Sequence, residues 1–276
     1  MPTANLFTGD ALDLLRGPAI PDRSCVAAIT SPPYFRQRQY TDDPAEIGDD
    51  GTLDEYLDAL VEVFSAVRPK LLPGGILWVN IGDTYNSYNR NRGRGGYLSS
   101  RQDVSRSVQQ HRGLLDPERR SKSALAVPQR LAARLVDAGW ILRADIVWDR
   151  AAMPERIRDR PRRTTERILM LAERPQNLAR VPMGRPDLAT DVWRLPTASG
   201  ASVHSARFAP ALPEACLSWL RDAPGAVLDP FSGSGSTGLA AAAEGRDYYG
   251  IDLSPRFTEA ARESIHPHFD DVRTNL

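Results

Sequence analysis

The fold is decided by the stretch Asp229-Pro230-Phe231-Ser232-Gly233-Ser234-Gly235-Ser236-Thr237-Gly238, which lies between a predicted strand over 226–228 and a predicted alanine-rich helix over 237–244. Glycines in such a turn let the backbone bend sharply and approach a ligand, and the free amides at the helix start favour an anionic group. Asp252 ends the next predicted strand, where its carboxylate is placed to accept hydrogen bonds from a ribose diol. The pattern therefore predicts a nucleoside-binding crevice at the carboxyl ends of adjacent strands.

The rest of the chain alternates strands and helices in the same way. Val26 to Thr30 is a compact apolar run typical of a buried parallel strand, and Leu53 to Val67 has apolar residues at helical spacing, with Asp50 or Thr52 as its cap. We expect further strands over 76–81, 140–148, 167–172 and 248–251, helices over 127–138 and 213–220, and a strand followed by the start of a helix over 4–15.

Length and charge suggest one domain with a basic insertion. The chain has 276 residues, with 35 Lys and Arg against 35 Asp and Glu, and a formal net charge of zero argues at first against a polyanionic partner. The average conceals a split, because residues 84–185 hold 22 basic and 10 acidic residues, which leaves 13 basic and 25 acidic residues elsewhere. A block of charge +12 therefore sits in a body of charge −12. Nearly all the basic residues are arginines, which make forked contacts to phosphate and guanine.

Several classes of protein and site are excluded. Cys25 and Cys216 lie far apart in apolar runs, so we interpret both as buried packing residues and expect no metal site. No apolar run approaches the length of a membrane span, and the first residues lack the pattern of a signal peptide. We therefore expect a cytoplasmic protein.

A second chemical signal is the tetrapeptide Ser31-Pro32-Pro33-Tyr34, at the end of its own predicted strand. Two prolines hold the backbone extended and remove two amide donors, so the carbonyls there can point outward as acceptors. Ser31 and the Pro32 carbonyl can accept hydrogen bonds from an amino group, and Tyr34 can stack on the ring that carries it. Alone, the tetrapeptide is also compatible with a plain turn; with the glycine loop it indicates a site for a planar group bearing an amine.

Together these motifs resemble the DNA amino-methyltransferases of the permuted (beta) kind, in which the catalytic tetrapeptide precedes target recognition and the cofactor loop comes last. The resemblance covers most of the chain. It rests on Gly9-Asp10-Ala11, Thr30-Ser-Pro-Pro-Tyr34, Asn80-Ile-Gly-Asp-Thr-Tyr85, Asp191-Val-Trp193, His204 with Phe208 and Pro210, Asp229-Pro-Phe-Ser-Gly-Ser-Gly235, and Gly250-Ile-Asp252.

The resemblance implies a Rossmann-like α/β methyltransferase fold: a mostly parallel twisted sheet flanked by helices, with permuted motif order and arginine-rich insertions for DNA. It implies one domain over 1–276, a flexible basic insertion over 84–125, target recognition over about 150–190, and a cofactor-binding part over 200–276. It implies S-adenosylmethionine as cofactor, held by Asp10, Ala11, Thr30, His204, Phe208, Asp229, Pro230, Phe231, Gly233, Gly235, Thr237 and Asp252. This chain departs from the family in having Ser236 where a Thr is usual and Asp252 where Glu is common.

The resemblance also bears on the target base. Ser31-Pro-Pro-Tyr34 preceded by Thr30 is similar to enzymes that methylate cytosine N4, whereas adenine-N6 enzymes more often carry Asp or Asn at the first position. We therefore expect site-specific cytosine-N4 methylation, with adenine N6 as the alternative. Cytosine C5 chemistry is excluded, because it needs a cysteine nucleophile and neither cysteine lies in a suitable polar loop.

The expected partner is double-stranded DNA, with the target base flipped out onto Tyr34. We therefore expect the cytoplasmic protein to be associated with the nucleoid. Two arginine clusters are candidates for binding it; they consist of Arg90, Arg92 and Arg94, and of Arg156, Arg158, Arg160, Arg162 and Arg163. The alternative interpretation of both clusters is a solvated loop that only aids solubility. A homodimer and a cognate restriction endonuclease are further candidate partners.

Two other functional classes remain as alternatives. The glycines Gly233, Gly235 and Gly238 satisfy a dinucleotide-binding fingerprint, which would suit a nicotinamide-dependent dehydrogenase but leaves the tetrapeptide and the arginines unused. A catalytically silent DNA-binding module would keep the arginines without needing a cofactor, and S-adenosylmethionine binding separates it from an enzyme.

Overall fold

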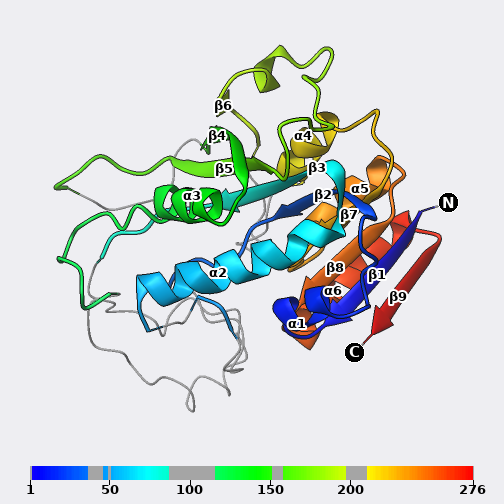
Figure 1. Cartoon of the computed structure of the whole chain (residues 1–276), viewed down its shortest axis with the longest axis horizontal. Helices are drawn as coiled ribbons and strands as arrows, with labels where there is room; N and C mark the ends of the chain where they lie inside the picture. The colour runs from blue at the N-terminus through cyan, green and yellow to red at the C-terminus, as the bar shows by residue number, and fades with distance from the viewer. Residues whose placement is uncertain are drawn as a thin grey trace.

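The computed structural model describes residues 2–36, 46–48, 51–86, 116–150, 158–196 and 210–275. These residues form a nine-stranded sheet in the order β6-β4-β5-β3-β2-β7-β8-β1-β9 (Figure 1). The strands are β1 (Thr3–Thr8), β2 (Cys25–Thr30), β3 (Leu71–Ile81), β4 (Ile141–Asp149), β5 (Thr165–Ala172), β6 (Val192–Trp193), β7 (Ala226–Asp229), β8 (Tyr248–Asp252) and β9 (Asp271–Asn275).

Only β5 runs against its neighbours, pairing antiparallel with β3 and β4, while all other pairings of the described strands are parallel. A parallel sheet covered on both faces needs strands that are apolar throughout, and all six residues of β2 are buried. The predicted Rossmann-like α/β fold is confirmed. Because β1 pairs with both β8 and β9, the start and the end of the chain lie at the same edge of the sheet.

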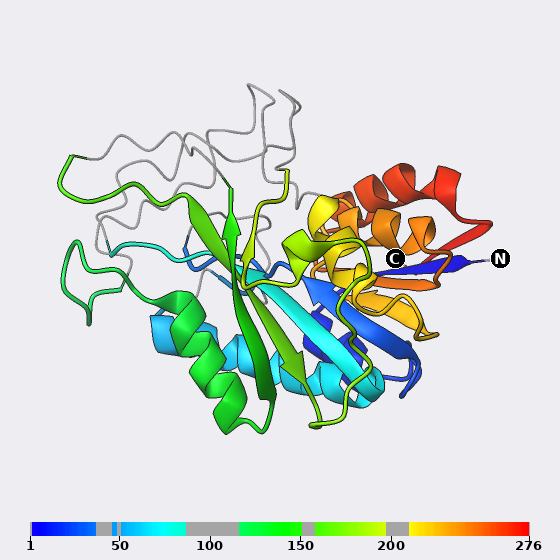
Figure 2. The same ribbon diagram turned by 90° about the horizontal axis from the view of Figure 1, so that it is seen from above.

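Helices cover both faces of the sheet, as Figure 2 shows. On one face lie α1 (Ala11–Arg16), α2 (Leu53–Val67) and α3 (Val127–Asp137), and on the other lie α4 (Ala211–Ser218), α5 (Ser236–Ala243) and α6 (Pro255–Ile265). Two separate groups of buried side chains fill the space between the sheet and these layers. None of the described helices has the length and apolar character that crossing a membrane requires.

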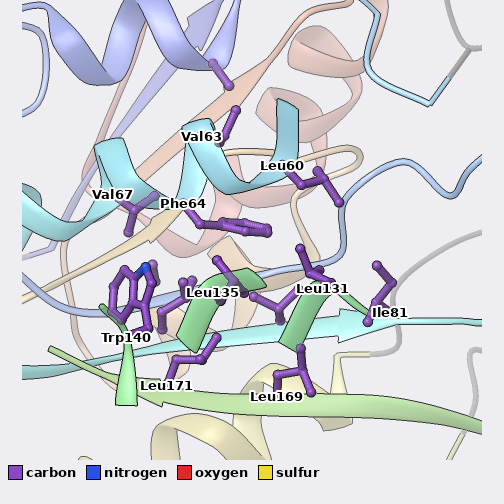
Figure 3. Close-up of a cluster of buried hydrophobic side chains, with 14 of the residues drawn as sticks. Leu60, Val63, Phe64, Val67, Ile81, Leu131, Leu135, Trp140, Leu169 and Leu171 are labelled. Atoms are coloured by element: carbon purple, nitrogen blue, oxygen red, sulfur yellow. The ribbon is translucent and has the colours of Figure 1, made fainter. Parts of the chain in front are cut away.

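The core beside α2 follows from its sequence pattern. Its buried residues recur every three or four positions, and Thr52 and Glu55 close its start with a reciprocal capping box. Figure 3 shows side chains of this stripe, such as Leu60 and Phe64, packing toward Leu131 and Leu135 of α3 above β3 and β5. This packing holds α2 and α3 against the sheet, on the face that they share.

The structure extends several of the predicted elements. β3 begins at Leu71 and includes Pro73-Gly74-Gly75, for which the sequence predicts a turn before a strand at 76–81. A side chain at Gly75 would lie 3.0 Å from the carbonyl oxygens of Leu72 and Val26, so the pairing of β2 with β3 depends on a residue without one. The sequence does not predict α6, β9 or the two-residue strand β6.

The basic insertion begins and ends at one point of the body. The side-chain amide nitrogen of Asn86 donates to the backbone carbonyl of Asp116 at 2.8 Å, and its side-chain oxygen Oδ1 accepts from the Asp116 backbone amide at 3.0 Å. The fully buried Asp116 side chain also binds Arg119 and accepts from the amide of Leu53 at the start of α2. These contacts fasten both flanks of residues 87–115, which lie outside the described residues, to the helical layer.

Candidate active site

The two chemical signals of the sequence meet at one edge of the sheet. β2 and β7 are parallel neighbours, so Thr30 at the end of one lies beside Asp229 at the end of the other. The Thr30 hydroxyl donates to Asp229 Oδ1 at 2.6 Å, between two side chains that are fully or almost fully buried. The tetrapeptide and the glycine loop, 199 residues apart where they touch, therefore form parts of one site.

Asp229 is a buried carboxylate held by neutral donors. The backbone amide of Phe231 donates to it at 3.0 Å, in addition to Thr30. Burial raises its pKa from 3.8 to about 6, against the lowering effect of these hydrogen bonds and of Thr237. Pro230 is buried in the turn that follows. Among the described residues no Lys or Arg forms an ion pair with Asp229, so its negative charge is available to a cationic ligand.

Asp252 ends β8 on the other side of the same loop. Its two carboxylate oxygens accept from the amides of Gly233 and Ser254, each at 2.9 Å. Burial raises its pKa to about 6, with Asp229 and Glu46 adding to the rise. Each oxygen keeps a lone pair beyond these bonds, so Asp252 can also accept from a hydroxyl group.

The glycine loop has the conformation that its sequence predicts. Gly233 and Gly235 have φ values of +53° and +83°, in the left-handed region that favours glycine. A Cβ atom at Gly235 would lie 2.9 Å from a methyl of Ile265, whereas one at Gly233 would meet nothing within 4 Å. The loop thus packs against α6 at one glycine and borders open space at the other, whose amide binds Asp252.

Asp10, a predicted cofactor contact, also caps a helix. Its carboxylate caps α1 by accepting from the Asp13 amide at 2.9 Å, and Ala11 is buried. The preceding Gly9 donates its amide to the carbonyl of Asp252 at 3.0 Å. Asp10 therefore lies at the same edge of the sheet as the glycine loop.

The carbonyls of the tetrapeptide differ in their partners. Tyr56 of α2 donates its hydroxyl to the Pro33 carbonyl at 2.8 Å, so this oxygen is occupied from within the protein. No described residue donates to the Pro32 carbonyl. Of the two proline carbonyls, Pro32 is the one left to accept from a ligand, next to the Ser31 hydroxyl.

Three residues that contact the tetrapeptide or its partners were not predicted as site residues from the sequence. Asn80 of β3 lies with its amide nitrogen 3.5 Å from Ser31 Oγ and 3.0 Å from the Tyr34 hydroxyl. Glu166 of β5 accepts from Tyr34 at 2.8 Å and from Asn80 at 2.9 Å, and Arg150 forms an ion pair with Glu166. Asn80 begins a motif quoted above, but Glu166 is one acid among arginines and carries no local signal of its role.

Tyr34 is held as a neutral phenol. Burial and the negative charge of Glu166 raise its pKa well above 10. Its ring packs on Gly82, where a Cβ atom would come within 2.8 Å of Tyr34 Cε2.

The second arginine cluster partly surrounds Tyr85, which follows the end of β3. The guanidinium groups of Arg160 and Arg163 lie 3.5 Å and 5.6 Å from the centroid of its ring. Arg158 and Arg162 are exposed, and all four lie in the segment that leads into β5. Arg90, Arg92, Arg94, Arg156, His204 and Phe208 lie outside the described residues.

Known proteins are similar to this chain over most of its length. The model of a DNA methylase family matches residues 26–263. The chain is 36% identical over 277 residues to the Type II methyltransferase M.XycI of Xanthomonas campestris pv. cyanopsidis, covering 98% of this chain and 90% of the relative. It is 35% identical over 266 residues to the Type II methyltransferase M.Cfr9I of Citrobacter freundii, covering 94% of this chain and 86% of the relative.

Solved structures share the fold at lower identity. The PvuII DNA methyltransferase (cytosine-N4-specific) superposes with a TM-score of 0.69 at 19% identity, covering 98% of this chain and 94% of that one. A DNA modification methylase of Thermus thermophilus, TTHA0409, in complex with S-adenosyl-L-methionine, superposes with a TM-score of 0.68 at 22% identity, over 99% of both chains. The match over residues 26–263 and the identity to full-length relatives show that this chain belongs to the N6/N4 family of DNA methylases.

Proposed function

We propose that this DNA methyltransferase transfers the methyl group of S-adenosylmethionine to the exocyclic N4 amine of a cytosine, flipped from the duplex at a specific site. The observation that carries the proposal is the 2.6 Å hydrogen bond between Thr30 and Asp229. It joins the residue before the amine-binding tetrapeptide to the first residue of the glycine loop. A methyl donor on the loop and an amine on the tetrapeptide would therefore be neighbours.

The cofactor side suits S-adenosylmethionine by its charge and its space. Asp252 would accept the ribose hydroxyls, and Asp229 would lie toward the methionine end, where its charge favours a cation. Gly233, Gly235, Pro230, Phe231 and Thr237 would shape the cradle, with Asp10 and Ala11 near the adenine; these roles, and those of Thr30, His204 and Phe208, remain predictions. When bound, the cofactor supplies an electrophilic methyl group on a sulfonium centre.

The tetrapeptide would activate the amine by position and hydrogen bonding. Ser31 and the Pro32 carbonyl would accept the two amine hydrogens, which draws the nitrogen toward tetrahedral geometry and localises its lone pair. The lone pair of the amine would then be free to form a bond to the methyl group, as the methyl–sulfur bond breaks with its electron pair left on sulfur. The proton released from the methylated nitrogen would pass to water. Tyr34 would stack on the base, which typically returns about 1–3 kcal/mol of the unstacking cost. Catalysis would then consist of orientation and electrostatics, without a covalent intermediate.

Cytosine N4 is proposed over adenine N6 on the identity of residue 31. A serine begins the tetrapeptide here, and the structural neighbour PvuII methyltransferase is named as cytosine-N4-specific. Adenine N6 is the second candidate, because both targets are exocyclic amines that the same clamp can hold. A duplex of random sequence should be methylated with the enzyme, digested to nucleosides and analysed by mass spectrometry. N4-methyldeoxycytidine supports the proposal, and N6-methyldeoxyadenosine overturns this choice of base.

DNA would approach along the arginines at the same edge of the sheet. Arg160 and Arg163 are oriented by Tyr85, while Arg158 and Arg162 reach into solvent, so all four are placed to meet phosphates. Target recognition by residues 150–190 stays a prediction, and part of that range, 165–172, is the inner strand β5. Binding should weaken with salt, by roughly 0.9 in the log-log slope for each neutralised phosphate. A homodimer and a restriction partner also stay predictions.

A further inference from the structure

The hydroxyl group of Tyr34 lies in a polar cluster built by three other segments of the chain. It donates to Glu166 Oε2 at 2.8 Å and accepts from Asn80 Nδ2 at 3.0 Å. Glu166, 9% exposed, also accepts from Asn80 at 2.9 Å and is paired with Arg150 through its other oxygen. The carboxylate that holds the Tyr34 hydroxyl is therefore itself fixed from two sides.

The ring of Tyr34 is constrained by a close neighbour as well. It packs on Gly82 so closely that an added Cβ atom would come within 2.8 Å of Cε2. Arg150, behind Glu166, stacks 5.1 Å from the ring centroid of Trp148 and donates its backbone amide to Thr164 at 2.8 Å. A hydrogen bond from a phenol to a carboxylate is short and strong, so a chain of firm contacts runs from β4 to the tyrosine.

We infer that Glu166 is a positioning residue that acts through the Tyr34 hydroxyl to fix the plane of the ring on which the target base stacks; this inference rests on the proposed function. A ring oriented before DNA arrives loses little freedom when the base stacks on it, so the base meets a prepared surface. The role of Glu166 requires no contact with the base or with the cofactor. Its loss should therefore affect turnover and base stacking rather than cofactor affinity.

The competing explanation is that Glu166 and Arg150 merely hold β4 and β5 together. The chain offers a matched control on the same two strands, where Asp145 of β4 forms an ion pair with Arg167 of β5 at 3.4 Å. Asp145 makes no described contact with the tetrapeptide. Asp145→Ala therefore removes a carboxylate between β4 and β5 without touching Tyr34.

The test is a double-mutant cycle read by kcat, by KM for DNA and by calorimetry of S-adenosylmethionine binding. Glu166→Ala and Tyr34→Phe should each lower kcat about ten-fold, and the double variant should be no slower than the slower single variant. Glu166→Gln should keep most of the activity, because its amide oxygen can still accept from Tyr34. Cofactor affinity should stay within about two-fold throughout, and Asp145→Ala should leave kcat within about two-fold.

A second measurement reports on the stacking of the base itself. It records the fluorescence of a duplex that carries 2-aminopurine at the target position. The flipped fluorophore is quenched when it stacks on an aromatic ring, so Glu166→Ala should give a brighter complex than the wild type, and Asp145→Ala should not. Losses in kcat that multiply in the double variant, or a loss in Asp145→Ala equal to that in Glu166→Ala, would overturn the inference. If Glu166→Ala does not fold, Tyr34→Phe carries the test, because it removes the hydroxyl that Glu166 holds. Its 2-aminopurine complex should be brighter and its kcat lower than in the wild type, and a wild-type signal with wild-type kcat would overturn the inference.

Failure of the proposed function has a different signature. A wild-type enzyme that methylates no duplex DNA and gives no 2-aminopurine signal overturns the proposed function, whatever the variants do. A wild-type enzyme that shows both, with multiplicative losses in the cycle, overturns only the role of Glu166.

Discussion

Two buried carboxylate environments flank the candidate site, and they are built differently. Asp229 and Asp252 are held by hydroxyl and backbone amide donors, and within the described residues neither has a cationic partner. Glu166, on the other side of the tetrapeptide, is paired with Arg150 and bonded to Tyr34 and Asn80. One side keeps negative charge available, whereas the other has its charge neutralised within the protein.

The difference separates the two tasks of a methyltransferase. Uncompensated carboxylates cost stability in the free protein. In the proposed function, Asp229 and Asp252 would attract the cationic cofactor, which would supply the missing positive charge on binding. A cluster whose charge is neutralised within the protein gains little from a cationic ligand and instead holds its neighbours in place. Substitutions on the first side should therefore change cofactor affinity, and substitutions on the second should change turnover.

The largest effect is expected at the point where the two sides meet. Ser31→Ala removes an acceptor for the amine hydrogens, so kcat should fall by about 100- to 1,000-fold, the range seen when a preorganised hydrogen bond to a reacting group is removed. Calorimetry should show S-adenosylmethionine affinity nearly unchanged. Equal losses in turnover and in cofactor affinity would contradict the role given to Ser31.

On the cofactor side, Asp252→Ala should weaken S-adenosylmethionine binding by about 10- to 100-fold, because hydrogen bonds to a charged group are worth about 1.5–3 kcal/mol. Turnover at saturating cofactor should fall much less. The measurement is calorimetry beside a methyl-transfer assay, with Asp247→Ala as a control, since this exposed carboxylate binds Thr3 away from the glycine loop. An unchanged affinity would remove Asp252 from the cofactor site.

On the tyrosine side, Gly82→Ala should lower kcat about ten-fold, because the new Cβ atom would come within 2.8 Å of the Tyr34 ring and displace it. Cofactor affinity should not change. In a chain that already carries Tyr34→Ala the same substitution should have no further effect on kcat, and an additional loss there would show that Gly82 acts elsewhere.

The comparison also predicts opposite pH dependences for binding and for stability. Asp229 and Asp252 have pKa values raised from 3.8 to about 6, so both take up protons in the folded protein as the pH falls from 7 to 5. Cofactor affinity should then fall by about three- to ten-fold, because the carboxylates lose the charge that favours a cation. The free energy of unfolding of the cofactor-free protein should change in the other direction. An acid whose pKa is raised by folding adds to the free energy of unfolding while it is protonated. This addition is fully present below pH 3.8, the usual pKa of the carboxyl group, and is lost as the pH rises through about 6, its pKa in the folded protein.

Calorimetry and urea denaturation at the same pH values measure the two quantities. Asp229→Asn should flatten both profiles, although Asp252 keeps part of the dependence. Affinity and stability that rise or fall together between pH 5 and 7 would contradict this account of the carboxylates.

The smallest effect is expected at the arginine surface, outside both environments. Arg162→Ala should weaken DNA binding by only a few-fold and lower the salt slope by about 0.9, because one exposed side chain neutralises about one phosphate. Tyr85→Ala should lower the slope by up to twice as much, since it releases both Arg160 and Arg163. Fluorescence anisotropy over a range of salt concentrations measures both slopes, and slopes equal to that of the wild type would remove these residues from the DNA surface.

Most of the sheet could be predicted because its strands are uniformly apolar and its helices carry a regular stripe, as in β2 and α2. The two edge strands were missed for the opposite reason. β9 has one apolar residue, Val272, among four polar ones, and β6 has only two residues, so neither shows a hydrophobic pattern that predicts a strand. Residues such as Ser31 and Asp229 could be predicted as a pair because each ends or follows a recognisable strand.

Glu166 could not be predicted, because its function depends on contacts rather than on local sequence. It is the second residue of β5, which runs against both of its neighbours, and the antiparallel pairing brings its carboxylate beside residues from β3 and from the loop after β2. Two arginines flank it at short range, which masks it as part of a basic run. The direction in which a strand pairs within a sheet is set by tertiary structure, so no local sequence pattern predicts it.

The contact between Asn86 and Asp116 has a consequence for how such an enzyme can diversify. Because both flanks are anchored to the same place on the body, the 29 positions between them can change in length and composition without altering which strands pair. An inherited insertion or deletion there would leave the sheet and both carboxylate environments intact. New versions of this segment can therefore be tried by evolution, or exchanged between relatives in the laboratory, on a body that folds in the same way each time.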